Sequence, residues 1–283
     1  MHLLMVVLIM IWTLDAVAIS VGVRNIPEMA LLCMKYLAAL PVILLAAVSG
    51  RHLEKPKKKD LPMIFISAIV GNILYFGAEY TAILHLPISI STVVVGILPA
   101  ASYLTDCFIM KKPVRLPILL AVFVSLIGLG LVVGSRSGTE SGDLIGYICC
   151  FLCVAIYILY GWLLRFLDTD YHPVSICLYQ MVIAVVLLLP MTVSSLPLSV
   201  STHDFIFCVV IAGILSSGIG YMIEVRGLIE LGTTISGVYI NLLPVFTAAA
   251  GVLFLNETMS ALQVFGSLLV IACSIYITLQ NDV

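Results

Sequence analysis

Charged residues are scarce in this chain, and their scarcity excludes most classes of soluble protein. Only 10% of its 283 residues are Asp, Glu, Lys or Arg, whereas 62% are hydrophobic. A soluble protein of this size could not keep so apolar a surface in water, so we expect the surrounding medium to be largely lipid. The net charge of −2 leaves no basic stripe, and we expect no nucleic-acid partner.

The sequence also lacks the motifs that mark common enzymes and ATP-driven pumps. It contains no GxxxxGK[ST] phosphate loop, no HExxH, no GxSxG and no polar segment long enough to form a soluble domain. The eight cysteines lie almost entirely in apolar segments, and the CxxC of Cys150 and Cys153 has no second ligand pair nearby. We therefore expect no enzymatic activity, no metal and no cofactor.

The sequence consists mostly of long apolar segments separated by short polar ones. A bilayer-crossing helix needs about 20 apolar residues, and an open sheet edge does not survive in lipid. We therefore predict an all-α integral membrane protein with ten transmembrane helices. The predicted spans are roughly 3–23, 27–49, 61–84, 88–110, 114–134, 144–164, 174–194, 205–228, 233–255 and 260–280.

The chain repeats itself at an offset of 145 residues. Glu79 lies 20 residues before Pro99, and Glu224 lies 20 residues before Pro244. Between them, matching positions carry the same residues: Leu86 and Leu231, Ile90 and Ile235, Ser91 and Ser236, Val93 and Val238, and Leu98 and Leu243. Each proline removes a backbone hydrogen bond in mid-span, and the freed carbonyl either lines a cavity or accompanies a kink that fits neighbouring helices. Duplication of this kind is typical of transporters built from internal repeats.

The basic residues predict the orientation of the bundle. With the N-terminus in the cytoplasm, ten of the thirteen basic residues fall in inner loops, and only Arg24 and Arg136 fall in outer ones. We expect both termini to be cytoplasmic in a multi-pass protein of the cell membrane. Five helices per copy is an odd number, so the second copy enters from the opposite side and the two five-helix repeats are inverted. Repeat 1, the polar linker and repeat 2 are residues 1–134, 135–143 and 144–283.

Several motifs resemble those of a known family. The stretch from Gly213 to Ile277 carries GILSSGIGYMIE, LGTTISGVYINLLPVFTAAAGVLFLNE and LQVFGSLLVI, and the first half carries WTLDAVAISVG and YFGAEYTAILHLPISISTVVVGILPA. Nearly the whole chain resembles an EamA-type transporter of the drug/metabolite transporter superfamily. The resemblance implies ten helices in two inverted repeats around a substrate cavity, and residence in a bacterial inner membrane. It also implies transport of amino acids, nucleotides, sugars or drugs.

Ionisable side chains at bilayer depth are costly and usually face a cavity. Asp15, Lys35, Glu79, Asp106 and Glu224 lie within predicted spans. Aromatic and amide side chains beside them supply further candidate contacts. The candidate substrate-binding or coupling residues are Glu79, Glu224, Asp15, Lys35, Trp12, Asn72, Tyr75, Tyr221 and Asn241.

Glu79 and Glu224 are the central candidates. The α-helical spacing places Glu79 on one face with Asn72, Tyr75 and Phe76, and the offset gives Glu224 an equivalent face that includes Tyr221. Either acid is expected to bind a cationic or amine group, or to carry a coupling proton. The alternative is a structural salt bridge, for example Glu79 with Lys35 or Glu224 with Arg226.

Asp15 and Lys35 also have two interpretations. Asp15 lies three residues after Trp12, and an acid beside an aromatic ring can hold a cation. Alternatively, Asp15 neutralises Lys35 across the first two helices. Lys35 is the candidate partner for a substrate carboxylate, or else for Asp15 or Glu79. Its counterpart in the second repeat is the neutral Gln180, so the fold as such does not require this charge.

The sequence therefore predicts a secondary-active transporter that works by alternating access. The excess of acids favours amino acids, amines or cationic drugs as exported substrates, with protons as a candidate coupling ion. The alternatives are a nucleotide- or sugar-type metabolite transporter and a multi-pass membrane sensor or scaffold that does not transport. Gly130 and Gly134 form a GxxxG, which points to helix contact within the subunit or between the subunits of a homodimer.

Overall fold

The computed structural model is helical throughout the residues that it describes. These are residues 1–86, 91, 94–111, 113–134, 143–167, 171–196, 201–243, 245–246 and 260–281. The helices of the first half are α1 (His2–Asn25), α2 (Glu28–Ser49), α3 (Leu61–Ala68), the π-helix η1 (Ile69–Leu74), α4 (Tyr75–His85), α6 (Leu98–Ile109) and α7 (Leu116–Gly134).

The second half has the same character. Its helices are α8 (Leu144–Phe166), α9 (Pro173–Ser194), α10 (Thr202–Phe205), the π-helices η2 (Ile206–Ile211) and η3 (Gly213–Gly220), α11 (Tyr221–Glu230), α12 (Gly232–Ile240) and α14 (Ala261–Asn281). The prediction of an all-α protein is confirmed for the described residues. Parts of the predicted spans 88–110 and 233–255, together with the linker 135–142, lie outside them.

Membrane-length helices are present in both halves. Within the described residues, five helical stretches are long and apolar enough to cross a bilayer, and shorter apolar helices accompany them. The five are Glu28–Ser49, Leu61–His85, Leu144–Phe166, Pro173–Ser194 and Thr202–Glu230. Large apolar side chains such as Leu3, Leu45 and Phe108 lie more than two-thirds exposed, as a lipid-facing surface requires. The chain is an integral membrane protein.

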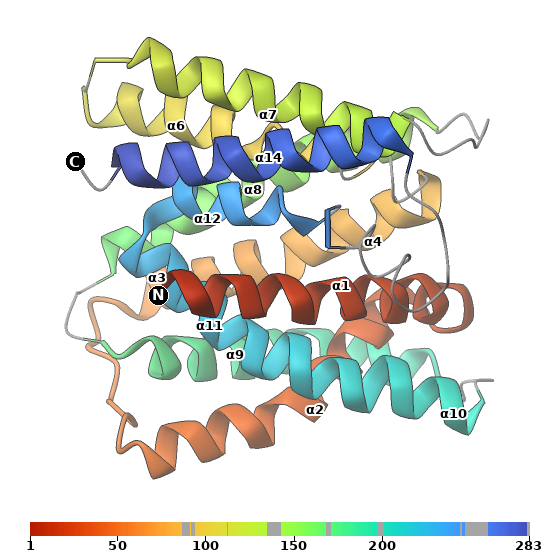
Figure 1. Ribbon diagram of the computed structural model, residues 1–283. Helices are drawn as coiled ribbons and strands as arrows, with labels where there is room; N and C mark the ends of the chain where they lie inside the picture. The colour runs from red at the N-terminus through yellow and green to blue at the C-terminus, as the bar shows by residue number, and fades with distance from the viewer. Residues whose placement is uncertain are drawn as a thin grey trace.

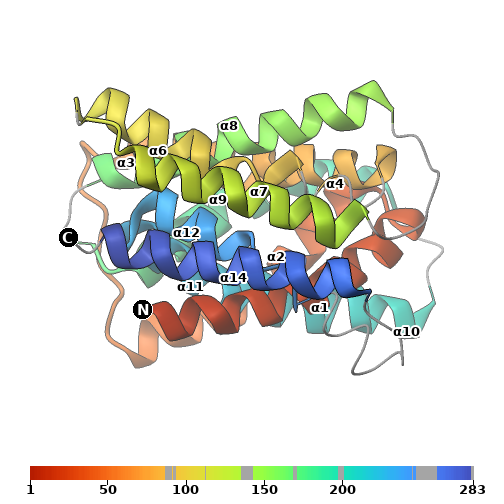
Figure 2. The ribbon, with the colours of Figure 1, turned by 45° about the horizontal axis from the view of Figure 1, so that its top comes forward.

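The helices lie side by side as one bundle (Figures 1 and 2). Both views place α7 and α14 next to each other, and these two helices pack together extensively. Helix α2 packs against α9, and α4 packs against α8. The interior of the bundle is thus built by helices from both halves of the chain.

Irregular helix geometry recurs at equivalent places in the two halves. The π-helix η1 covers 69–74, and the offset of 145 residues carries it onto 214–219, within η3. Helical turns also break at Gly96 and Ile97, and again at Asn241 and Leu242. Turns with π geometry and mid-span breaks in membrane helices occur where the backbone lines a cavity or a functional site.

The sequence predicts a lost backbone hydrogen bond at Pro99, with a freed carbonyl or a kink, and the structure shows a break in the helix at this place. The helix breaks before this proline, so Pro99 lies in the first turn of α6, where the missing N–H would have had no intrahelical partner. The carbonyl freed by the break belongs to Gly96, and it accepts a hydrogen bond from Asn241 Nδ2 at 3.2 Å. These two positions are separated by the repeat offset itself. Pro244 lies outside the described residues.

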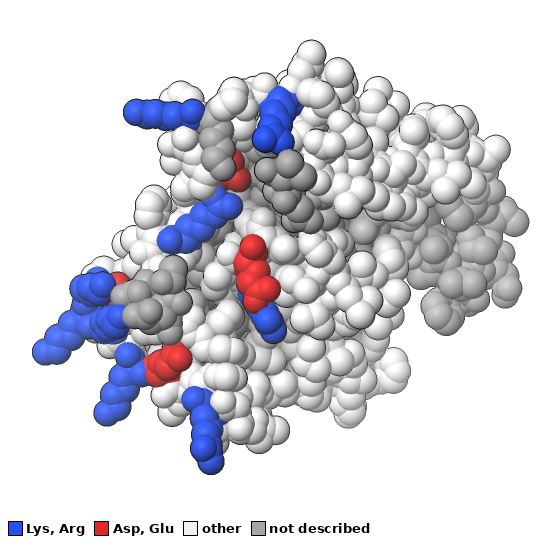
Figure 3. All heavy atoms as spheres, turned by 60° about the vertical axis from the view of Figure 1, so that its left-hand side comes forward, with Lys and Arg blue, Asp and Glu red and all other residues white. Residues whose placement is uncertain are grey.

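Basic side chains gather at one end of the bundle. Figure 3 views that end directly, and Lys and Arg side chains project from it. Helix α1 begins there and α14 ends there (Figure 1). This is the arrangement from which the sequence predicts a cytoplasmic location for both termini.

At this end of the bundle, the loop between α2 and α3 packs against the start of α9 and hydrogen-bonds to it. The rings of His52 and His172 stack at a centroid distance of 3.5 Å and an interplanar angle of 2°. The His172 backbone N–H donates to Glu54 Oε2 at 2.8 Å, and the ring Nδ1 of His172 accepts from the backbone N–H of Val174 at 3.3 Å. Since His172 is the N-cap of α9, the loop contact also closes the end of that helix.

This contact is predicted to weaken in acid. Burial and the neighbouring His52 hold the pKa of His172 below its ordinary value of about 6.5, against the smaller opposing effect of Glu54. The unfolded chain therefore binds more protons than the folded chain as the pH falls through that range, and stability is lost. The thermal midpoint in detergent should fall from pH 7.5 to 5.0, and His172→Asn, which keeps a capping side chain, should flatten that dependence. The matched control is His203→Asn, because the His203 side chain is 91% exposed; equal pH dependence in both variants would refute the assignment.

Candidate functional site

A cavity of about 100 Å³ lies where the two halves meet. That is several times the roughly 10–15 Å³ that one water needs on the same measure, so the cavity has room for a small organic molecule. Helices α1 and α4 supply most of its wall from the first half, and Cys153 of α8 and Ile240 of α12 join them from the second. Its lining residues are Trp12, Asp15, Ala16, Ile19, Tyr75, Phe76, Glu79, Ile83, Ser91, Val95, Cys153, Ile240, Asn241 and Leu243.

Glu79 is the charged group that this cavity leaves without a direct partner. No hydrogen bond or ion pair joins its carboxylate to another of the described residues, although the charges of Asp15 and Lys35 act on it with opposite sign. The rings of Tyr75 and Phe76, one turn earlier in α4, lie in the same wall. They meet edge to face at 5.1 Å and leave Glu79 in a largely apolar setting.

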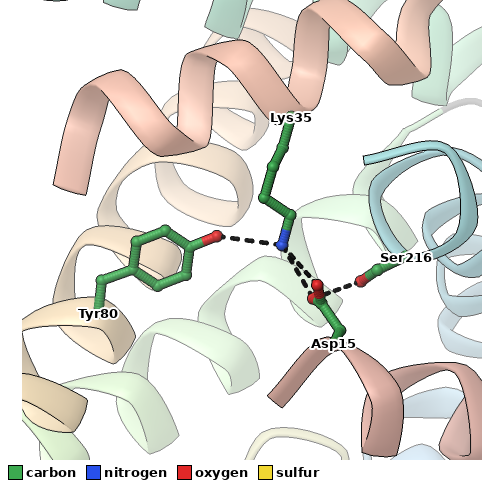
Figure 4. Close-up of polar contacts among 4 residues, drawn as sticks. All are labelled: Asp15, Lys35, Tyr80 and Ser216. Carbon is green, nitrogen blue, oxygen red and sulfur yellow. Dashed lines mark hydrogen bonds and ion pairs between the residues drawn. The ribbon is translucent and has the colours of Figure 1, made fainter. Parts of the chain in front are cut away.

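A buried ion pair stands beside the cavity (Figure 4). Lys35 Nζ donates to Asp15 Oδ1 at 2.7 Å and to Oδ2 at 2.9 Å, and its third contact is the Tyr80 hydroxyl at 3.3 Å. Ser216 of η3 donates to Asp15 Oδ2 at 2.7 Å. The Lys35 side chain is 1% exposed and that of Asp15 is 7% exposed. Of the two interpretations of Asp15, the structure realises the ion pair with Lys35, while Asp15 also lines the cavity.

Close backbone contact positions this cluster. A Cβ atom at Gly213 would lie 2.7 Å from the Lys35 carbonyl oxygen, so glycine lets η3 approach α2 directly. Ser216 belongs to the same π-helix and donates to Asp15 of α1. The geometry brings a hydroxyl of the second half onto a carboxylate of the first.

Asn72 and Tyr221 belong to a second polar cluster rather than to the cavity wall. Asn72 Nδ2 donates to the Tyr221 hydroxyl at 2.8 Å, and Tyr221 donates to Gln180 Oε1 at 2.6 Å. Tyr160 also contacts Gln180 Oε1, at 3.0 Å, and Gln180 Nε2 donates to Ser67 at 2.6 Å. The prediction that Asn72 shares the Glu79 face fails because η1 has π geometry, which rotates Asn72 out of the α-helical phase.

The two clusters occupy matching positions in the repeat. The offset carries Asp15 onto Tyr160 and Lys35 onto Gln180, and in each half the two side chains contact each other. Tyr160, Tyr80 and Ser216 are further residues of these clusters that were not predicted as partners. The signal for Tyr160 was present, because the 20-residue spacing from Asp15 to Lys35 recurs from Tyr160 to Gln180.

Glu224 is 5% exposed and lies outside the described cavity wall. Its charge nevertheless interacts with that of Glu79, so the two repeat-related carboxylates share one electrostatic environment. Neither salt bridge considered for these acids forms: Lys35 pairs with Asp15, and Arg226 pairs with Glu230 at 2.6 Å. A cation or a proton near both carboxylates would relieve their mutual repulsion.

Comparison with known proteins identifies the class of this membrane protein as a transporter. The chain belongs to the EamA-like transporter family, whose model matches residues 1–134 and 144–279. An uncharacterized transporter of Archaeoglobus fulgidus is 22% identical over 95% of both chains. The threonine/homoserine exporter RhtA of Escherichia coli K12 is 25% identical over 86% of this chain and 79% of its own. A solved crystal structure of 18% identity has the same fold, with a TM-score of 0.80 over 98% of both chains.

Removing one partner of the buried ion pair should lower the free energy of unfolding far more than removing both partners. Asp15→Asn leaves the Lys35 ammonium buried beside a neutral amide, and a loss of about 3–5 kcal/mol is expected. The double variant Asp15→Asn/Lys35→Gln carries no uncompensated charge and should recover most of that loss. Thermal or denaturant unfolding in detergent measures both. A double variant less stable than Asp15→Asn would contradict the assigned pairing.

Proposed function

We propose that this chain is a secondary-active exporter of small metabolites such as amino acids, amines or cationic drugs, working by alternating access. The observation that carries the proposal is Glu79, a carboxylate without a direct partner in a cavity built by both halves of a membrane transporter. The absence of Lys, Arg and His from the described cavity wall disfavours nucleotide- and sugar phosphate-type substrates. Export is favoured by the relatives that are named exporters.

The proposed architecture is ten transmembrane helices in two inverted repeats, residues 1–134 and 144–283, joined by 135–143. It is supported by two matches to the family model and by the recurrence of π geometry, helix breaks and paired side chains at one offset. Five helices in each repeat place the second copy in the membrane with the opposite orientation. The basic end of the bundle is proposed to face the cytoplasm of a bacterial cell, with both termini.

Polar contacts that would close the basic end join the two proposed repeats. Arg165 Nη1 lies 3.5 Å from Asp106 Oδ1, and Thr234 donates to Asp106 Oδ2 at 3.1 Å. Asp106 belongs to α6, whereas Arg165 and Thr234 belong to α8 and α12. Alternating access requires such contacts to separate when the cavity opens toward this end.

Proton coupling is proposed to use the two acids. Glu79 and Glu224 interact electrostatically inside a bundle where Lys35 is already paired with Asp15. A proton held by this pair of acids would leave when a cationic substrate binds at Glu79, because two positive charges compete for the same carboxylate. Substrate and proton would then move in opposite directions.

Glu79→Gln tests the proposal. Substrate-driven exchange in proteoliposomes should be lost, because the amide keeps the shape of the side chain but removes its charge, while thermal unfolding stays cooperative. The matched control is Glu230→Gln, because Glu230 pairs with its helix neighbour Arg226 at the surface; exchange should persist in this variant. Full exchange by Glu79→Gln would refute the role of Glu79. No exchange by wild type, with any compound that binds, would favour a sensor or scaffold.

A further inference from the structure

We propose that the cavity selects an organic ammonium ion with an apolar body and rejects the zwitterionic amino acid of the same skeleton. The inference rests on the proposed transport function and narrows the substrate class of the same cavity. Three observations support it: Lys35 is already fully paired, the cavity wall holds acceptor atoms without partners among the described residues, and the side chains around them are apolar or aromatic.

Lys35 has no donor left for a substrate carboxylate. An ammonium group has three N–H donors, and three contacts use them: the two oxygens of Asp15 at 2.7 and 2.9 Å and the Tyr80 hydroxyl at 3.3 Å. The Lys35 side chain is 1% exposed and does not line the cavity. A ligand carboxylate would have to displace Asp15, whose own second donor is Ser216.

In the described cavity wall, no other basic side chain takes the place of Lys35. Among the described residues the cavity wall contains no Lys, Arg or His. The neighbouring residues outside the described ranges, 87–90, 92–93, 244 and 247–259, contain none by sequence. A carboxylate in the cavity would thus be desolvated without a counter-charge, which is strongly unfavourable.

Beside the indole N–H of Trp12 and the hydroxyls of Tyr75 and Ser91, the wall holds two acceptors that have no hydrogen-bond partner among the described residues. The Glu79 carboxylate has no hydrogen-bond partner among the described residues. Asn241 is 3% exposed, and its Nδ2 donates to Gly96, so the amide orientation is fixed and Oδ1 is left as an acceptor without a partner in the described structure. A charged acceptor and a neutral acceptor in one wall suit an ammonium group, which carries a positive charge and several N–H donors.

The rest of the wall suits an apolar body. The rings of Trp12, Tyr75 and Phe76 line the cavity together with the aliphatic side chains of Ile83 and Leu243. Aromatic faces attract a cation and also pack against apolar carbon. They therefore favour both the ammonium group and the apolar body of the ligand. An aromatic amine combines the two features in one small molecule.

A set of four compounds that share one skeleton tests the inference. Purified full-length protein in detergent is titrated by calorimetry at pH 7 with phenethylamine, phenylalanine methyl ester, phenylalanine and 3-phenylpropionate. The two compounds with an amine and no carboxylate should bind at least about tenfold more tightly than phenylalanine. The carboxylate without an amine should not bind. Equal binding of phenylalanine and phenethylamine, or binding of none of the four, would overturn the inference.

Two variants sharpen the test. Glu79→Gln should lose phenethylamine binding at least about tenfold, whereas the surface control Glu230→Gln should keep it. Asp15→Asn releases the Lys35 ammonium and should reduce the preference for phenethylamine over phenylalanine, because a ligand carboxylate then finds a free cation. An unchanged preference in folded Asp15→Asn would contradict the role given to Lys35. If Asp15→Asn does not fold, the relative binding of phenethylamine and phenylalanine to the wild-type protein still tests the proposed selectivity.

Exchange of labelled phenethylamine in proteoliposomes separates the two proposals. Tight binding of amines without exchange would refute the proposed transport function but would still support the proposed selectivity for amines. Exchange of phenylalanine at the same rate as phenethylamine would keep the transporter and refute the selectivity.

Discussion

The ion pair between Asp15 and Lys35 is the interaction on which the account of this protein depends. An isolated charge is costly in a bundle this apolar. The pair gives the deeply buried Lys35 three polar contacts, and Ser216 donates a further hydrogen bond to the Asp15 carboxylate. The contact joins α1, α2, α4 and η3, and so ties both halves of the chain. The pair also neutralises the positive charge of Lys35 beside the cavity, so the Glu79 carboxylate determines which charge the cavity attracts.

Much of the fold could be predicted from the sequence because lipid imposes a simple rule. Apolar runs bounded by charge, Pro and Gly coincide with the described helices, since the backbone in a bilayer must satisfy itself within helices. The sequence predicts a lost backbone bond at Pro99 but not the position of the helix break at Gly96 and Ile97, because the residues around Pro99 are as apolar as those of a continuous span. The π geometry of η1 was likewise invisible to α-helical spacing, and it moved Asn72 to another face.

The candidate site was recovered in part. Trp12, Asp15, Tyr75, Glu79 and Asn241 meet at one cavity, because acids and aromatics at bilayer depth are rarely placed toward lipid. The choice between partners of Lys35 could not be made from sequence, since it depends on how α1 crosses α2. Only coordinates could place Ser216 against Asp15, because that contact joins residues 201 positions apart.

A structure of the protein with bound phenethylamine tests the central claim most directly. We expect the ammonium nitrogen within hydrogen-bond distance of the Glu79 carboxylate, the aromatic ring among Trp12, Tyr75 and Phe76, and Lys35 still paired to Asp15. An ammonium group held away from Glu79, or a Lys35 that has left Asp15 for the ligand, would contradict it.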